Sequence, residues 1–329
     1  MTRTTGFDAV LVISFGGPRG LDDIRPFLAN VVRGRPVPPA RLEEVAHHYA
    51  EFGGVSPLTE ITLRQAVLVE ERLRDRHLPV FVGMRNWDPY LADTLWEMAD
   101  AGVRRAVGFI AAAHRSASSC LQYRQNVADA QQRVRERGGR PPEIIYVSDW
   151  HTHPGFIAAN AAHIEAARAA LPEDRRAAAR LVVTAHSLPT RMPGVERYQE
   201  QLRESARLVA AQLAWTDWTL AYQSRSGRPQ DPWLGPDVVE YLREAHASGV
   251  PAAVLSPIGF VCDHIEVLYD LDREAADACR EMGLPMARAA AANAHPRFIE
   301  TMADAVIEMH ERYRNGRPLV LVPAETPGG

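Results

Sequence analysis

Short runs of apolar residues alternate along this chain with longer stretches in which apolar residues recur at helical spacing. The short runs lie at residues 9–14, 80–83, 106–111, 144–147, 181–184, 219–222, 252–255 and, more weakly, 286–289. The longer stretches include residues 61–76, 90–101, 123–137, 154–171, 195–213, 265–282 and 297–314. A run that is apolar throughout is typical of a parallel strand covered on both faces. Repeated strand–helix–strand units therefore predict an α/β fold.

The eight predicted strands form two sets of four, separated near residues 148–150. Two doubly wound parallel sheets that face each other across a cleft are the architecture that this pattern predicts, with units at 1–148 and 149–296. The last helix, about 297–316, is a candidate to pack back on the first unit. Ligands bind at the carboxyl ends of the strands in such sheets, so site residues are sought directly after each strand.

Composition excludes several classes of function. The chain has 37 basic and 41 acidic residues, a formal net charge of −4, and so lacks the basic excess that nucleic acid binding requires. Its three cysteines, Cys120, Cys262 and Cys279, are too few for a disulfide framework or a four-cysteine metal site. The longest apolar run, near 251–261, is broken by prolines and shorter than the roughly 18 residues that span a bilayer. We expect a cytoplasmic monomer without stable membrane insertion.

Glycines follow the first predicted strand, in the sequence SFGGPRG at residues 14–20. Their spacing matches neither the dinucleotide fingerprint nor the P-loop, which favours a tight turn over nucleotide binding. Glycines there would also let a flat ligand approach the backbone. His186 follows the strand 181–184, where a neutral imidazole can bind a metal or accept a proton. The alternative is a histidine hydrogen-bonded into the turn before Pro189.

Carboxylates are spaced regularly after the strand 252–255. Glu266, Asp270 and Glu274 recur every four residues, which predicts one row along a helix, and Asp263 extends it by three residues. Oxygen ligands in a line suit a divalent cation or successive proton transfers. A solvated acidic face near a helix N-terminus is the alternative, although the helix dipole does not account for Glu274.

These segments resemble the signature segments of ferrochelatases. The resemblance lies in AHSLP at 185–189 and GFVCDHIEVLYDLD at 259–272, and extends to SFGGP at 14–18, FGGVSPL at 52–58, MRNW at 84–87 and SSCLQYR at 118–124. It implies an enzyme that inserts Fe²⁺ into a porphyrin, built from two facing Rossmann-like domains with four-stranded parallel sheets, of the class II chelatase type. The macrocycle would lie in the cleft between them.

The resemblance also implies roles for individual residues. His186 corresponds to the metal-site histidine and Glu266 to its acidic partner across the macrocycle, both catalytic. Asp270 and Glu274 correspond to an acidic row that guides metal or protons behind that glutamate. Porphyrin contacts are implied for Phe15, Arg33, Ser56 and Tyr123. Which group takes each pyrrole proton is left open. Fe²⁺ is the substrate metal, and no tightly bound cofactor is expected.

Departures from the family pattern affect the product and the substrate. Phe15 replaces a tyrosine that ligates product iron in some relatives, and no cysteine follows Arg314, so no iron–sulfur cluster is expected. His48 and Val32 stand where porphyrin-site residues, one of them an arginine, are expected. The basic loop 32–39, together with Arg115, favours the four propionates of coproporphyrin III.

The expected reaction is therefore the formation of coprohaem, for a downstream coprohaem-using enzyme in haem b biosynthesis. Three alternatives remain from the sequence: a protoporphyrin IX ferrochelatase, a cobalt or nickel chelatase on the same fold, and a non-catalytic tetrapyrrole carrier.

Overall fold

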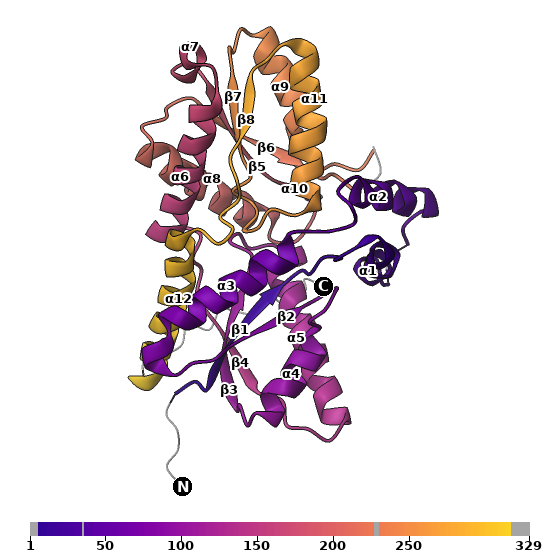
Figure 1. The fold of residues 1–329 in the computed structure, drawn as a ribbon, viewed down its shortest axis with the longest axis vertical. Helices are drawn as coiled ribbons and strands as arrows, with labels where there is room; N and C mark the ends of the chain where they lie inside the picture. The colour runs from indigo at the N-terminus through magenta and orange to yellow at the C-terminus, as the bar shows by residue number, and fades with distance from the viewer. Residues whose placement is uncertain (1–5, 35, 227–229, 317–329) are drawn as a thin grey trace.

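The computed structural model describes residues 6–34, 36–226 and 230–316 and contains two four-stranded parallel sheets (Figure 1). The first sheet has the order β2-β1-β3-β4, from β1 (Ala9–Ser14), β2 (Val80–Met84), β3 (Arg105–Ile110) and β4 (Glu143–Tyr146). The second has the equivalent order β6-β5-β7-β8, from β5 (Arg180–His186), β6 (Trp218–Gln223), β7 (Ala253–Ser256) and β8 (Met286–Arg288). All eight predicted strands are confirmed. Each sheet changes winding direction between its first and third strands, where doubly wound sheets bind ligands.

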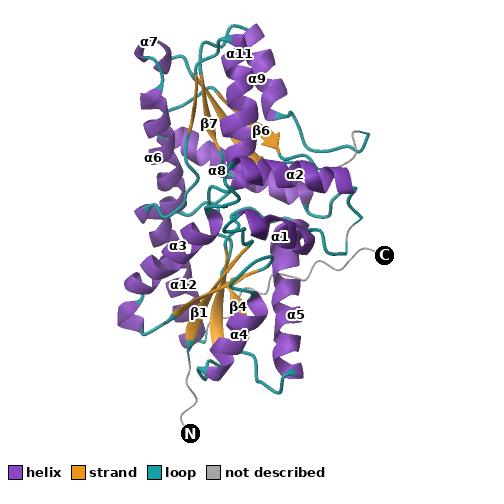
Figure 2. Ribbon diagram, turned by 45° about the vertical axis from the view of Figure 1, so that its right-hand side comes forward, coloured by secondary structure: helices purple, strands orange, loops and turns teal. Residues whose placement is uncertain are grey.

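Helices cover both faces of each sheet, as the secondary-structure colours of Figure 2 make plain. Those of the first unit are α1 (Ile24–Val31), α2 (Pro39–Glu51), α3 (Leu58–Arg72), α4 (Leu91–Asp100) and α5 (Gln122–Glu136). Those of the second unit are α6 (Pro154–Ala170), α7 (Glu173–Arg176), α8 (Val195–Gln212), α9 (Val238–Ala247), α10 (Ile265–Tyr269) and α11 (Ala276–Met282). The sequence analysis did not predict α1 and α2, which lie between β1 and β2.

Strand β1 explains why the strand runs are apolar throughout. Leu11 and Ile13 pack in a cluster with α4 and α5, whereas Val10 and Val12 pack on the opposite face in a cluster with α3 and α12 (Pro296–Arg314). Both faces are therefore removed from water. The second of these clusters continues into β5, α6 and α8 of the second unit. One hydrophobic core thus runs through both units, and the division near residue 148 does not separate two cores.

Helix α12 lies along both units. It contacts α6, and it also contacts α3 and β3 (Figure 1). Phe298 near its start packs 5.6 Å from Trp150 and 6.0 Å from Phe156, and Tyr313 near its end packs 5.0 Å from Phe7, measured between ring centroids. The helix therefore packs against both units and joins the first to the second. No helix among the described residues is long and apolar enough to cross a bilayer.

The predicted helix 265–282 is not one regular helix. Helix α10 gives way to a π-helix at Asp270–Ala275, after which α11 resumes the ordinary α-helical bonding. A π-helix bonds residue i to i+5 and is wider than an α-helix, with about 4.4 residues per turn, so residues four apart still lie near one face. The predicted row of carboxylates therefore crosses a change of helix type, and Asp270 still lies close enough to Glu266 and Glu274 for both charges to raise its pKa.

Candidate active site

The carboxyl ends of the two sheets meet at the candidate site. Phe15, directly after β1, packs in a cluster that includes Phe27 of α1, Tyr49 of α2, and Ile265 and Leu268 of α10. His186 is the last residue of β5, and α10 follows β7. The residues predicted from the ends of β1, β5 and β7 thus come from the winding changes of both sheets, as the strand-end rule requires.

His186 has a defined tautomer. Its Nδ1 lies 2.5 Å from the backbone carbonyl of Ser187, which can only accept, so Nδ1 carries the proton of the neutral ring. Nε2 is then left with its lone pair, able to accept a proton or bind a metal ion. The Tyr198 hydroxyl, on α8, donates to the His186 carbonyl at 3.1 Å and braces the end of the strand. The alternative, a histidine hydrogen-bonded into the turn before Pro189, holds for Nδ1, whereas Nε2 lies 3.9 Å from Glu266 Oε2.

Glu266 lies on the first turn of α10, opposite that lone pair. The helix begins where the His264 side chain caps the backbone N–H of Val267 at 3.1 Å. Glu266 Oε2 is 3.9 Å from His186 Nε2, and both side chains are part-exposed. A tetrapyrrole lying between these two atoms would keep each of them about 3.5 Å from the plane of the ring. The atoms would then be about 7 Å apart. In this structure the two atoms therefore lie too close together to hold a macrocycle between them, unlike the placement across the macrocycle that the resemblance implies.

Asp270 is the most perturbed of the predicted metal residues. Its Oδ2 accepts hydrogen bonds from the Ser224 hydroxyl and, at 3.1 Å, from Gln223 Nε2. Burial, reinforced by the charges of Glu266 and Glu274, raises its pKa to about 7, although the hydrogen bond from Ser224 opposes this. A carboxyl group with that pKa exchanges protons readily at neutral pH. Burial also raises the pKa of Glu274, and Asp237 adds to the effect.

The predicted metal residues do not form one ligand cluster. Among the described residues no three or more His, Cys, Asp or Glu side chains gather closely enough to hold a metal ion. Glu266, Asp270 and Glu274 form a succession instead, which fits a route better than a resident site. Asp263 does not extend that row. It lies before α10 and turns away to an ion pair with Arg288 at 2.9 Å, because a buried carboxylate requires a partner.

The glycine turn after β1 is explained by packing within the protein. A Cβ on Gly17 would lie 2.5 Å from the Cβ of Ser56, so the segment around buried Ser56 can lie there only against glycine. Gly16 has a φ of +86°, and a Cβ there would lie 2.9 Å from the backbone nitrogen of Trp87. The turn therefore accommodates the protein's own chain, which agrees with the tight turn that the sequence favoured.

The other predicted porphyrin contacts lie around this turn. Phe15 packs edge-on against Phe27 at 6.2 Å, and the Arg85 guanidinium lies 5.9 Å from the Phe15 ring centre. Tyr123, on α5, is buried, which raises the pKa of its hydroxyl. Arg33 is exposed and donates to the Asn30 side-chain oxygen.

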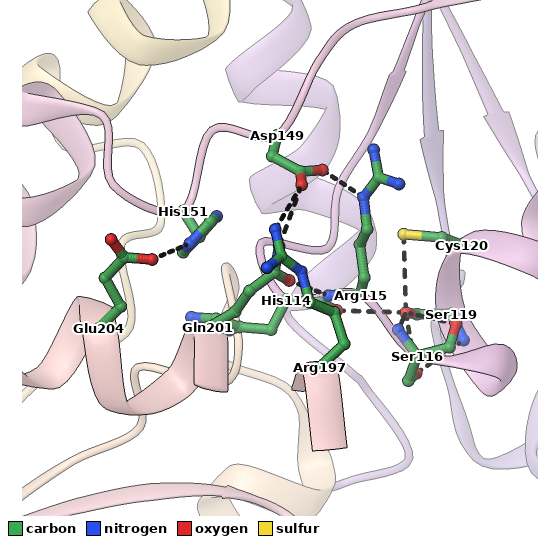
Figure 3. A network of polar contacts seen from close by, with 10 residues as sticks. All are labelled: His114, Arg115, Ser116, Ser119, Cys120, Asp149, His151, Arg197, Gln201 and Glu204. Atoms are coloured by element: carbon green, nitrogen blue, oxygen red, sulfur yellow. Dashed lines mark hydrogen bonds and ion pairs between the residues drawn. The ribbon is translucent and has the colours of Figure 1, made fainter. Parts of the chain in front are cut away.

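Two more positions named from the sequence have partners of their own. The His48 ring of α2 stacks on the Tyr269 ring of α10, with ring centroids 3.6 Å apart, so α2 lies beside α10 (Figure 1). Arg115 is paired with Asp149, which also contacts Gln201 at 3.1 Å and Arg197 at 3.6 Å (Figure 3). The structure therefore places Arg115 in a network between the strand-end loops of the first unit and α8.

Some residues of the site were missed from the sequence. Gln223 and Ser224, which hold Asp270, end β6 and directly follow it, so the strand-end rule could have found them. Arg85 directly follows β2 and could have been found in the same way. Tyr198 has no such signal, because it is one aromatic residue within a long amphipathic helix.

Comparison with known proteins agrees with this arrangement. A family model described as Ferrochelatase matches residues 7–310. The coproporphyrin III ferrochelatase of Mycolicibacterium smegmatis is 44% identical over 308 residues, covering 92% of this chain and 90% of the relative. The ferrochelatase of Rhodopirellula baltica is 45% identical, covering 94% and 88%. Among solved structures, the Bacillus subtilis sirohydrochlorin chelatase SirB in complex with cobalt superposes with a TM-score of 0.55 over 92% of this chain and 95% of that chain. The two sequences are 11% identical, so this similarity concerns the fold alone. On the family match and these identities, the chain belongs to the ferrochelatase family.

Proposed function

We propose that this protein inserts Fe²⁺ into coproporphyrin III to give coprohaem. The observation that carries the proposal is the pair formed by His186 and Glu266, with His186 Nδ1 bonded to the Ser187 carbonyl and Nε2 3.9 Å from a Glu266 carboxylate oxygen. Metal insertion must remove two N–H protons from the macrocycle and deliver a divalent cation to its centre. A lone pair beside a carboxylate, at the end of a row of further carboxylates, can serve both needs.

In the proposed mechanism the pair acts from one face of the ring. His186 Nε2 can take a proton from a pyrrole N–H, and the adjacent Glu266 carboxylate then stabilises the imidazolium. Asp270, with a pKa of about 7, can pass protons onward to Glu274 and solvent. The carboxylates hold Fe²⁺ through hard oxygen atoms, which release it to the four ring nitrogens that it prefers. Glu266 and His186 are thus the catalytic residues, and the succession behind them is the supply route.

The choice of coproporphyrin III rests on its four propionates and on the relatives named for it. Arginine binds carboxylates through two parallel hydrogen bonds, so arginines beside the ring favour the substrate with more carboxylates. Arg33 is oriented by Asn30, whose Nδ2 donates to the Asn86 carbonyl at 3.1 Å, and Arg85 lies next to Asn86 in sequence. Arg85 therefore belongs to the loop that bonds to the backbone of Ser14 and Phe15, and Arg33 is connected to that loop through Asn30.

A comparison of two porphyrins tests the proposal. Purified protein is given Fe²⁺ without oxygen, with coproporphyrin III or protoporphyrin IX, and insertion is followed by absorbance. We expect kcat/KM to be higher for coproporphyrin III and R85L to reduce that preference, while R19L, at an arginine paired with Asp88, leaves it unchanged. A higher value for protoporphyrin IX would favour the other porphyrin ferrochelatase. Insertion into neither, with tight binding of both, would favour a carrier.

The proposal also includes a cytoplasmic monomer without a tightly bound cofactor, which passes its product to a coprohaem-using enzyme. These features rest on the family resemblance and on the composition of the chain. Light scattering of the purified protein measures its mass in solution, and iron analysis after gel filtration measures bound metal. A stable dimer, or stoichiometric iron and sulfide, would contradict this part of the proposal.

A further inference from the structure

Five carboxylates lie within twelve residues of the acidic segment 263–274. They belong to Asp263, Glu266, Asp270, Asp272 and Glu274. Fe²⁺ would bind any of them, since all offer the same hard oxygen ligands. A productive route to the macrocycle requires that the cation meet only those in the succession behind Glu266.

One arginine contacts two of these carboxylates. Arg288 ends β8, where it pairs with Leu255 of β7, the strand that leads into the acidic segment. Its Nη1 donates to Asp263 Oδ1 at 2.9 Å, and its Nε and Nη2 donate to the two oxygens of Asp272 at 2.6 Å and 2.9 Å. The Asp272 contact is the two-bond fork that is characteristic of strong arginine–carboxylate pairs.

Burial and further partners make this arrangement rigid. The side chains of Arg288 and Asp263 are only 15% and 14% exposed. Asp263 also accepts from Asn293 Nδ2 at 2.7 Å and from the backbone N–H of Ala291 at 3.2 Å. Both oxygens of Asp263 and both of Asp272 therefore carry donors. The two residues flank Glu266 and Asp270, so Arg288 holds the segment on either side of them.

We propose that Arg288 is a positioning residue that divides the five carboxylates into two sets. It engages Asp263 and Asp272, and thereby leaves Glu266, Asp270 and Glu274 to receive Fe²⁺ and protons. Because Arg288 holds residues on both sides of α10, it also fixes the position of that helix, and so the distance between Glu266 and His186. The inference deepens the proposed function and depends on it for the role of the second set.

Two variants separate charge from geometry. R288M removes the cation and the fork, whereas R288K keeps the cation but cannot form the fork. Loss of a residue that orients metal ligands typically costs about 10- to 100-fold in activity. We expect R288M to lose kcat for Fe²⁺ insertion within that range while KM for the porphyrin stays within about twofold, and R288K to lie between R288M and the wild type.

Manganese binding reports the division of the carboxylates directly. Mn²⁺ prefers oxygen ligands and its bound fraction is measured by electron paramagnetic resonance, without porphyrin. We expect R288M to bind more Mn²⁺ than the wild type, because Asp272 loses the two-bond fork and Asp263 loses its ion pair with Arg288. The triple variant R288M/D263N/D272N should return Mn²⁺ binding to the wild-type level. An unchanged amount of bound Mn²⁺ in R288M would overturn the division, even if activity fell.

A matched control comes from the opposite end of the same sheet. Arg180 at the start of β5 forms a 2.6 Å ion pair with Asp217, and R180M should change neither kcat nor Mn²⁺ binding. An equal effect of R180M and R288M would assign Arg288 to general stability and overturn the proposal. The proposed function would fail if the wild-type protein inserted iron into neither porphyrin. The Mn²⁺ measurement does not depend on insertion, so the two failures can be distinguished.

Discussion

Replacing His114 should change how strongly acid destabilises this protein. His114 lies at the end of the first sheet, 2% exposed, with its Nε2 3.0 Å from the hydroxyl of Ser205 on α8 of the second unit. Burial lowers its pKa to about 3, and nearby His151 contributes in the same direction. The folded protein therefore keeps this ring neutral, whereas the unfolded chain protonates it near pH 6.5.

The sign and size of the effect follow from proton linkage. Above pH 6.5 neither state binds the proton, so His114 contributes no pH dependence. Between about pH 6.5 and pH 3 the unfolded state binds one more proton, and the free energy of unfolding falls by about 1.4 kcal/mol per pH unit. At pH 5 the loss is about 2 kcal/mol, a large part of the stability of an ordinary domain.

Urea unfolding at pH 7.5 and pH 5 measures this loss. H114Q is the informative variant, because its amide can still donate to Ser205 but does not titrate. We expect the wild type to lose about 2 kcal/mol more than H114Q between the two pH values. H47Q removes a histidine whose side chain is 76% exposed and should behave as the wild type. Equal losses in H114Q and the wild type would refute the reasoning, since all other titrating groups are shared.

Three predictions concern the site. H186A and E266Q should each lower the rate of metal insertion about 10²- to 10⁴-fold, which is the range for loss of a proton acceptor. Quenching of fluorescence should show that both variants still bind the porphyrin. Wild-type insertion rates in both variants would contradict the roles assigned to these residues. Because the pKa of Asp270 is raised to about 7, the insertion rate should increase with pH through that value, and a pH–rate profile of D270N should lack this step. The hydrogen bond from Ser224 lowers that pKa, so S224A should move the step to higher pH; a shift to lower pH would contradict the assignment.

The fold could be predicted largely because each strand is buried on both faces. Alternate residues of β1 enter two different clusters, so the strand is apolar up to Ser14 and can be recognised in the sequence. Helices α1 and α2 were missed although both carry apolar residues at helical spacing, because the prolines at 26, 36, 38 and 39 resemble the breaks of a loop. The π-helix was also hidden, because its residues do not differ from those of an ordinary amphipathic helix.

The sequence by itself determined the chemistry that the site contains. A histidine at the end of a strand and carboxylates at regular spacing follow from chain order alone, because the carboxyl ends of parallel strands collect at one edge. Only the tertiary structure decided which of those groups act together. It brought Arg288 from a later strand to Asp263 and Asp272, paired Arg115 with Asp149, and placed His186 Nε2 3.9 Å from Glu266 Oε2. Residues of one type in one segment look alike in a sequence, and they differ here because strand pairing places different partners beside them.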